Sequence, residues 1–164
     1  MKKTIFVAML LTLLLNGCTL WQESSVSQKP TVSSTNQTAS NNKLDLSNQQ
    51  LTKVPEYVFN RINLEELDLS NNLLTGAIQS QIGNLKNLKV LKANNNQMTG
   101  VPAEVGQLSK LQILDLSNNQ LTGLPNEMGN LKNLQTLNIS GNNYSVHDFD
   151  VIMKGLPANV KVIK

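Results

Sequence analysis

The sequence of 164 residues has one cysteine, one histidine and six aromatic side chains, and these scarcities exclude whole classes of protein. Cys18 alone cannot form an intramolecular disulfide. Together with His147 it makes no cluster with the spacing of a metal site. We therefore expect no bound metal and no cofactor.

Net charge is also small once the first residues are set aside. The formal charge of +3 includes Lys2 and Lys3, and the remaining 12 basic side chains exceed the 11 acidic ones by one. No basic run is interleaved with aromatic rings, as binding to a nucleic acid strand would require. The sequence therefore predicts no nucleic-acid partner.

No apolar run is long enough to cross a membrane. The longest, TIFVAMLLTLLL from Thr4 to Leu15, has twelve residues, whereas a spanning helix takes about 20. Because Lys2 and Lys3 precede it, the segment has the charged start and short apolar middle of a secretory signal. Residues 1–17 are predicted to be a signal peptide that is removed.

The four residues Leu15-Asn16-Gly17-Cys18 resemble the lipobox of bacterial lipoproteins. This resemblance implies that Cys18 carries lipid chains, palmitate among them, and becomes the first residue of a membrane-anchored protein. Thr19 is not the Asp that retains such proteins at the inner membrane. In a cell with two membranes, the resemblance therefore implies the outer membrane. The alternative is a plain signal peptide whose cysteine falls at its end.

The segment after the cysteine, residues 18–42, has little apolar character. Two thirds of the positions from Thr19 to Asn42 are Ser, Thr, Asn or Gln. Such a composition cannot bury enough apolar surface to offset the entropy of ordering the chain. We expect a flexible tether between a lipid anchor and a folded domain.

Internal repetition is the strongest signal in the sequence. Alternate residues such as Leu114 and Leu116 would point to one side of a short strand, with Asp115 on the other. Stacked copies would bury the leucine side in one continuous core. The repeated segments are LDLSNQQL, LDLSNNLL, LKANNNQM, LDLSNNQL and LNISGNNY, which begin at the nearly evenly spaced positions Leu44, Leu67, Leu91, Leu114 and Leu137.

These segments are similar to the leucine-rich-repeat pattern L-x-L-x-x-N-x-L. The resemblance implies an α/β solenoid, a right-handed horseshoe arc with a short parallel β-sheet on its concave face. Residues 43–164 would form five repeats with a C-terminal helix and a closing strand. The longest repeat, which contains LTGAIQSQIGNLKNL, looks like the variant of plant receptor kinases, but no kinase catalytic motif is present.

A recurrent asparagine follows each strand where the chain turns. Its amide can donate to backbone carbonyls left unpaired in the bend. A structural ladder is therefore a stronger interpretation of these residues than a ligand site. Gln49 takes this position in the first repeat, so we expect the ladder to be incomplete there. The predicted ladder residues are Asn72, Asn96, Asn119 and Asn142.

The two ends of the repeat array differ. Ser145 is predicted to cap a helix, with Asp148 reaching back to the cap, and Val160-Lys161-Val162 is predicted as a closing sixth strand. No apolar helix precedes Leu44. We expect the tether, a second copy or a partner to cover Leu44, Leu46 and Leu51, so self-association at this edge is open.

The outward side chains of the strands form the candidate binding surface. Val90 and Ile113 would be neighbouring exposed apolar residues within a charged rim, which suggests a small hot spot. Alternatively, β-branched residues there simply suit a strand. The candidate partner-binding residues are Lys43, Asp45, Glu66, Asp68, Val90, Lys92, Ile113, Asp115, Thr136 and Asn138.

Three functions compete for this sequence. The leading one is a non-enzymatic module that binds a protein partner at the bacterial cell envelope. The second is a structural envelope lipoprotein that contacts peptidoglycan or carbohydrate. An enzyme is the third, but the sequence offers no nucleophile with a paired base and no phosphate-cradling loop, so we expect none.

Overall fold

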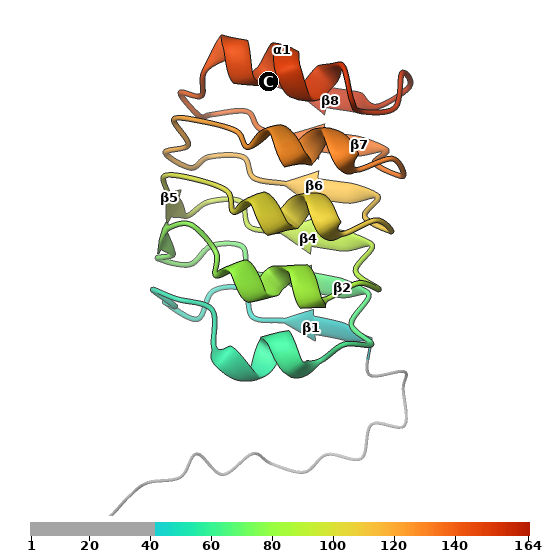
Figure 1. The fold of residues 1–164 in the computed structure, drawn as a ribbon. Coiled ribbons are helices and arrows are strands. Elements are labelled where there is room, and N and C mark those ends of the chain that lie inside the picture. Colours follow the sequence, from blue (N-terminus) through green and yellow to red (C-terminus); the bar gives the residue numbers. More distant parts are fainter. Residues whose placement is uncertain (1–41) are drawn as a thin grey trace, which may run out of the picture. The chain divides into compact units, whose positions relative to one another are not determined.

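The computed structural model describes residues 42–164, in which successive turns of chain stack into a solenoid (Figure 1). Cys18, the predicted signal segment and all of the predicted tether except Asn42 lie outside these residues. One parallel sheet runs along the stack in the order β1-β2-β4-β6-β7-β8. Its strands are β1 (Lys43–Asp45), β2 (Glu66–Asp68), β4 (Val90–Lys92), β6 (Ile113–Asp115), β7 (Thr136–Asn138) and β8 (Lys161–Ile163). The predicted α/β solenoid with a short parallel sheet is confirmed.

The repeated leucines form the core. Leu67, Leu91, Leu114 and Leu137 occupy the same position in consecutive strands and have no exposed surface. Burying a side chain of this size contributes roughly 1.5–3 kcal/mol. Because each repeat covers the leucines of its neighbour, the stack is stable where a single repeat would not be.

Short helices return the chain from one strand to the next. Four 3-10 helices, η1 (Glu56–Asn60), η2 (Ser80–Asn84), η3 (Ala103–Gln107) and η4 (Asn126–Asn130), lie opposite the sheet. A small second sheet pairs β3 (Thr75–Gly76) with β5 (Gln97–Met98). Close helix stacking requires glycine, because a Cβ atom on Gly106 would lie 2.2 Å from the carbonyl oxygen of Glu127 in η4.

The predicted asparagine ladder joins the repeats. Asn96 Nδ2 donates to the carbonyls of Leu69, Ala93 and Asn94, and its Oδ1 accepts from the backbone N–H of Leu74. Each rung therefore satisfies backbone groups in its own repeat and in the preceding one. The same pattern recurs at Asn72, Asn119 and Asn142.

The C-terminal end is closed by α1 (Val146–Met153) and by β8. Ser145 caps α1 as predicted, since its side chain accepts from the backbone N–H of Asp148. Two details of the prediction are wrong. Asp148 accepts from the N–H of Leu124 in the preceding repeat rather than reaching back to the cap. The closing strand is Lys161–Ile163 rather than Val160–Val162.

Helix type explains the displaced strand. Leu137 pairs with Val162 and not with Val160, so this last interval is longer than the others. An α-helix rises about 1.5 Å per residue, against about 2.0 Å for a 3-10 helix. The eight residues of α1 therefore cover little more distance than the five residues of η4. The closing repeat needs extra residues to reach the sheet.

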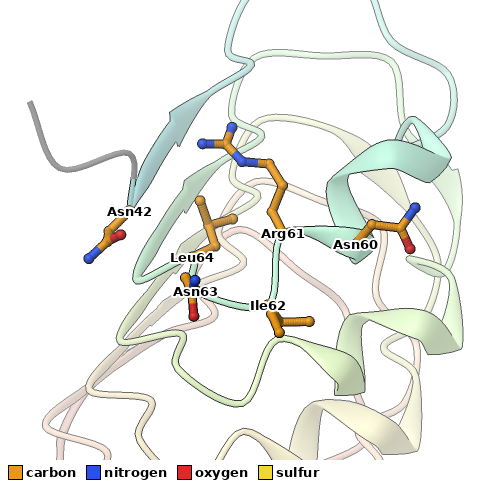
Figure 2. Close-up of a pocket in the computed structure, with 6 residues that line it drawn as sticks. All are labelled: Asn42, Asn60, Arg61, Ile62, Asn63 and Leu64. Carbon is orange, nitrogen blue, oxygen red and sulfur yellow. The ribbon is translucent and has the colours of Figure 1, made fainter. Parts of the chain in front are cut away.

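The N-terminal repeat has its own substitutions. Phe59 stands where η2, η3 and η4 have glycine, and it is buried at 3% exposure. Arg61 takes the position of the fully buried Leu85 in the next repeat. Figure 2 looks along the stack at this end, where the Arg61 side chain extends between β1 and η1. A polar residue thus lies across the end of the core, as a terminal repeat requires.

Candidate binding surface

The outward side chains of the six strands form two rows, one residue from each strand in each row. The parallel register places Lys43, Glu66, Val90, Ile113, Thr136 and Lys161 in the first row. The second row contains Asp45, Asp68, Lys92, Asp115, Asn138 and Ile163. All ten residues predicted for the surface therefore lie together on one face.

Ion pairs organise the charged part of this face. Lys43 Nζ lies 2.6 Å from Glu66 Oε2, and Lys92 Nζ lies 3.2 Å from Asp68 Oδ2. The hydrogen bond to Glu66 raises the pKa of Lys43 above its ordinary value. These pairs are partly exposed, so they contribute little to stability and remain available to a ligand.

The acidic residues of the second row also hold the backbone. Asp68 Oδ1 accepts from both the backbone N–H and the hydroxyl of Ser70, and Asp115 Oδ1 does the same with Ser117. In the turn after β1, the backbone N–H of Ser47 donates to Asp45 and lowers the pKa of that carboxyl. The primary role of the aspartate in the repeated Asp-Leu-Ser is therefore to stabilise the turn after the strand.

Val90 and Ile113 are direct partners across β4 and β6. Ile113 is 38% exposed, whereas Val90 is only half-buried. Of the two apolar residues of the predicted hot spot, Ile113 therefore presents more of its side chain to solvent than Val90. This pair lies in the middle of the sheet, where a bound surface would exclude water most completely.

The displaced closing strand adds two residues that the sequence did not predict. Lys161 continues the first row beside Thr136, and Ile163 continues the second row beside Asn138. Ile163 is 37% exposed. The alternation of side chains in Lys161-Val162-Ile163 is compatible with this strand. The regular spacing of the earlier repeats, however, predicts a strand that begins at Val160.

A hollow of about 260 Å³ lies at the N-terminal part of this face. Five of the ten predicted residues line it together with Leu44, namely Lys43, Asp45, Glu66, Asp68 and Lys92. A second hollow of about 240 Å³ lies on the same end of the stack, beside Ile62 and Arg61 (Figure 2). Both hollows therefore lie at the end of the solenoid that carries β1.

Among residues 42–164, no three His, Cys, Asp or Glu side chains gather to hold an ion. Within the same range, no helix has the length and apolar character to span a membrane. What this region offers is a surface of paired charges around an apolar centre.

Comparison with known proteins identifies the repeat. The sequence profile of a leucine-rich-repeat region matches residues 62–152. No curated protein sequence is significantly similar to the chain. Among solved structures, a leucine-rich-repeat protein of Leptospira interrogans is 43% identical, with a TM-score of 0.65. The match covers 70% of this chain but only 29% of that one.

Two plant structures from Arabidopsis thaliana are also similar. The ectodomain of the receptor kinase SOBIR1 is 32% identical over 73% of this chain and 66% of its own, with a TM-score of 0.59. The ectodomain of the membrane receptor kinase GASSHO1/SCHENGEN3, solved in complex with CASPARIAN STRIP INTEGRITY FACTOR 2, is 39% identical. That match covers 56% of this chain and 11% of that one, with a TM-score of 0.53. The chain belongs to the leucine-rich-repeat family.

Proposed function

We propose that this protein is a membrane-anchored, non-enzymatic module that binds a protein partner through the outward rows of its sheet at the bacterial cell envelope. One observation carries the proposal. Ile113 is 38% exposed at the middle of the sheet and lies next to Val90. On one side of it, an ion pair joins β2 and β4, and on the other side lies the polar strand β7. An apolar centre with a polar rim is the usual anatomy of a protein interface.

The similar structures support a protein as the partner. The plant ectodomain at 39% identity is bound to CASPARIAN STRIP INTEGRITY FACTOR 2. Its kinase activity does not bear on this chain, because the likeness is confined to the repeat scaffold. The scaffold presents a rigid row of strands, so a ligand pays little entropy to order the binding surface.

Exchange of Ile113 for aspartate tests the surface. We expect Ile113→Asp to abolish copurification of the partner while the unfolding temperature stays within a few degrees of wild type, because the side chain is exposed. The matched control is Val146→Asp at the start of α1, where Val146 is 71% exposed and lies away from the sheet. The readout is quantitative mass spectrometry of proteins crosslinked and copurified from intact cells.

The alternative function has a distinct outcome. If partners are unchanged in Ile113→Asp while the protein still sediments with the cell wall, the structural envelope role is favoured instead. The same result in Val90→Asp/Ile113→Asp would exclude this face as the protein-binding surface, provided that the double variant stays folded.

The membrane anchor rests on Cys18, which lies outside the described residues. We propose that Cys18 is lipidated and holds the domain at a membrane, the outer one where two are present. Support comes from the apolar segment of twelve residues that ends at Leu15, from the Leu15-Asn16-Gly17-Cys18 motif, and from the Ser/Thr-rich stretch after it.

Replacement of Cys18 tests the anchor directly. Cells fed a labelled palmitate analogue should label the wild-type chain and not Cys18→Ser, because only a thiol can take the thioether-linked lipid. In a detergent phase separation, the variant should also move from the detergent phase to the aqueous phase. Thr19→Ala is the matched control and should label normally. Equal membrane retention and labelling of Cys18→Ser would contradict the proposal.

A further inference from the structure

The first strand of the sheet has one unpaired edge. β1 pairs with β2, and no other strand of the described region lies against its second edge. The backbone N–H of Leu46 donates to Asp68 of β2. Because donors alternate along a strand, the N–H and C=O groups of Lys43 and Asp45 point to the open edge. Such an edge is a template for another strand.

We propose that the open edge of β1 pairs with β1 of a second copy of this chain, antiparallel and about a two-fold axis at Leu44. In this register Lys43 lies opposite Asp45 of the other copy, twice by symmetry. Residues 43 and 45 are also the ones whose backbone groups face outward, so they form the two hydrogen-bonded pairs. Backbone geometry and side-chain charge therefore select the same register.

The side chains of Lys43 and Asp45 are accessible to a second copy, although each already has a partner within its own chain. The Lys43 side chain is 76% exposed although it reaches Glu66, and Asp45 is exposed. Within its own sheet Asp45 lies beside Asp68, a neighbour of like charge. A lysine from a second copy would place a cation on its other side, which opposite charges across a strand pair favour.

The apolar side of the edge also fits a second copy. Two of the three leucines expected to need a cover, Leu44 and Leu51, are half-buried, whereas Leu46 is buried at 5% exposure. The leucines at the positions of Leu44 and Leu51 in later repeats are buried. Ile62, on the same end of the stack, is 60% exposed and borders the hollow shown in Figure 2. Closing two such ends against each other would remove apolar surface from water.

Charge argues against head-to-tail stacking. The far edge of the sheet, β8, is also unpaired among the described residues. Continuing the parallel register from β7 to β8 onto β1 of another copy would place Lys161 opposite Lys43. Like charges directly opposed are unfavourable. The arrangement is therefore a closed pair and not a growing fibre.

A charge exchange tests this pairing in the full-length chain. Two copies of the chain that carry different tags are co-expressed. One copy is purified by its tag, and the amount of the other copy that comes with it is measured as co-capture. Lys43→Asp paired with itself, or Asp45→Lys paired with itself, should lower co-capture about tenfold, because both opposed pairs become repulsive. Lys43→Asp paired with Asp45→Lys should restore it, because each pair is again complementary. Lys161→Asp on β8 is the matched control and should not change co-capture.

A double exchange keeps the test decisive if a single variant fails to fold. Lys43→Asp/Asp45→Lys should capture itself but not the wild-type chain. Absence of wild-type co-capture would overturn the proposal and leave the edge to another occupant. So would single variants that co-capture like wild type, or a mixed pair that stays as low as the like-charged pairs.

Discussion

Replacing Phe59 with alanine is expected to lower the free energy of unfolding by about 3–5 kcal/mol. Phe59 occupies the position of Gly83, whose Cβ position faces Glu104 of the next helix. Its ring therefore lies in the equivalent space between η1 and η2, and these helices approach less closely than the glycine-bearing pairs. Alanine would leave a cavity at the N-terminal end of the core.

Denaturant unfolding of Phe59→Ala measures this cost. Tyr57→Ala is the matched control, since Tyr57 lies in the same helix but is 53% exposed, and its loss should change stability by less than about 0.5 kcal/mol. If Phe59→Ala costs no more than the control, the ring does not fill the N-terminal core.

Asn119→Ala is expected to destabilise the protein by about 1–3 kcal/mol. The Asn119 amide donates to the carbonyls of Ala93, Leu116 and Ser117, and its Oδ1 accepts the N–H of Met98 at 3.0 Å. Asn119 is buried at 8% exposure, so water cannot replace these bonds without opening the repeat. Alanine would leave polar backbone groups unpaired.

Two further variants give this prediction its controls. Asn119→Asp should cost more than alanine, because a carboxylate cannot donate to the three carbonyls and its charge would be buried. Gln120→Ala, at the exposed neighbouring position, should be close to neutral. A thermal unfolding curve of Asn119→Ala that superimposes on that of Gln120→Ala would contradict the role of the ladder.

The strands and the asparagine ladder could be predicted because each depends on a local pattern that recurs. Leu114 and Leu116 must lie on the same face of the strand. The asparagine at the position of Asn119 must form hydrogen bonds with the backbone of the same turn in each repeat. Repetition multiplies a weak signal until chance is excluded. The incomplete first rung followed in the same way from Gln49, whose side chain is exposed.

The ends of the solenoid could not be predicted as well, because they depart from the repeat. Arg61 and Phe59 replace a leucine and a glycine, and their roles are evident only once the stacking of η1 on η2 is known. The closing strand was misplaced because the α-helical return needs more residues than a 3-10 one. Spacing inferred from the middle of an array fails where the local structure changes.

The predicted surface residues fall on one face because alternation in a strand is robust. The sequence does not indicate which of these side chains are available to a partner, because that depends on the hydrogen bonds and ion pairs that they form within the sheet. The carboxylates of Asp68 and Asp115 accept hydrogen bonds from Ser70 and Ser117. The apolar side chain of Ile113, in contrast, is exposed. Lys161 and Ile163 were missed with their strand.

Site-specific photocrosslinking in intact cells tests the central claim, binding of a protein through the outward rows of the sheet. A photoreactive amino acid at Ile113 is compared with one at Glu127, an exposed position on η4 on the opposite side of the solenoid. We predict one discrete crosslinked protein from position 113 and none from position 127. Equal labelling from both positions, or labelling from 127 alone, would contradict binding through this face.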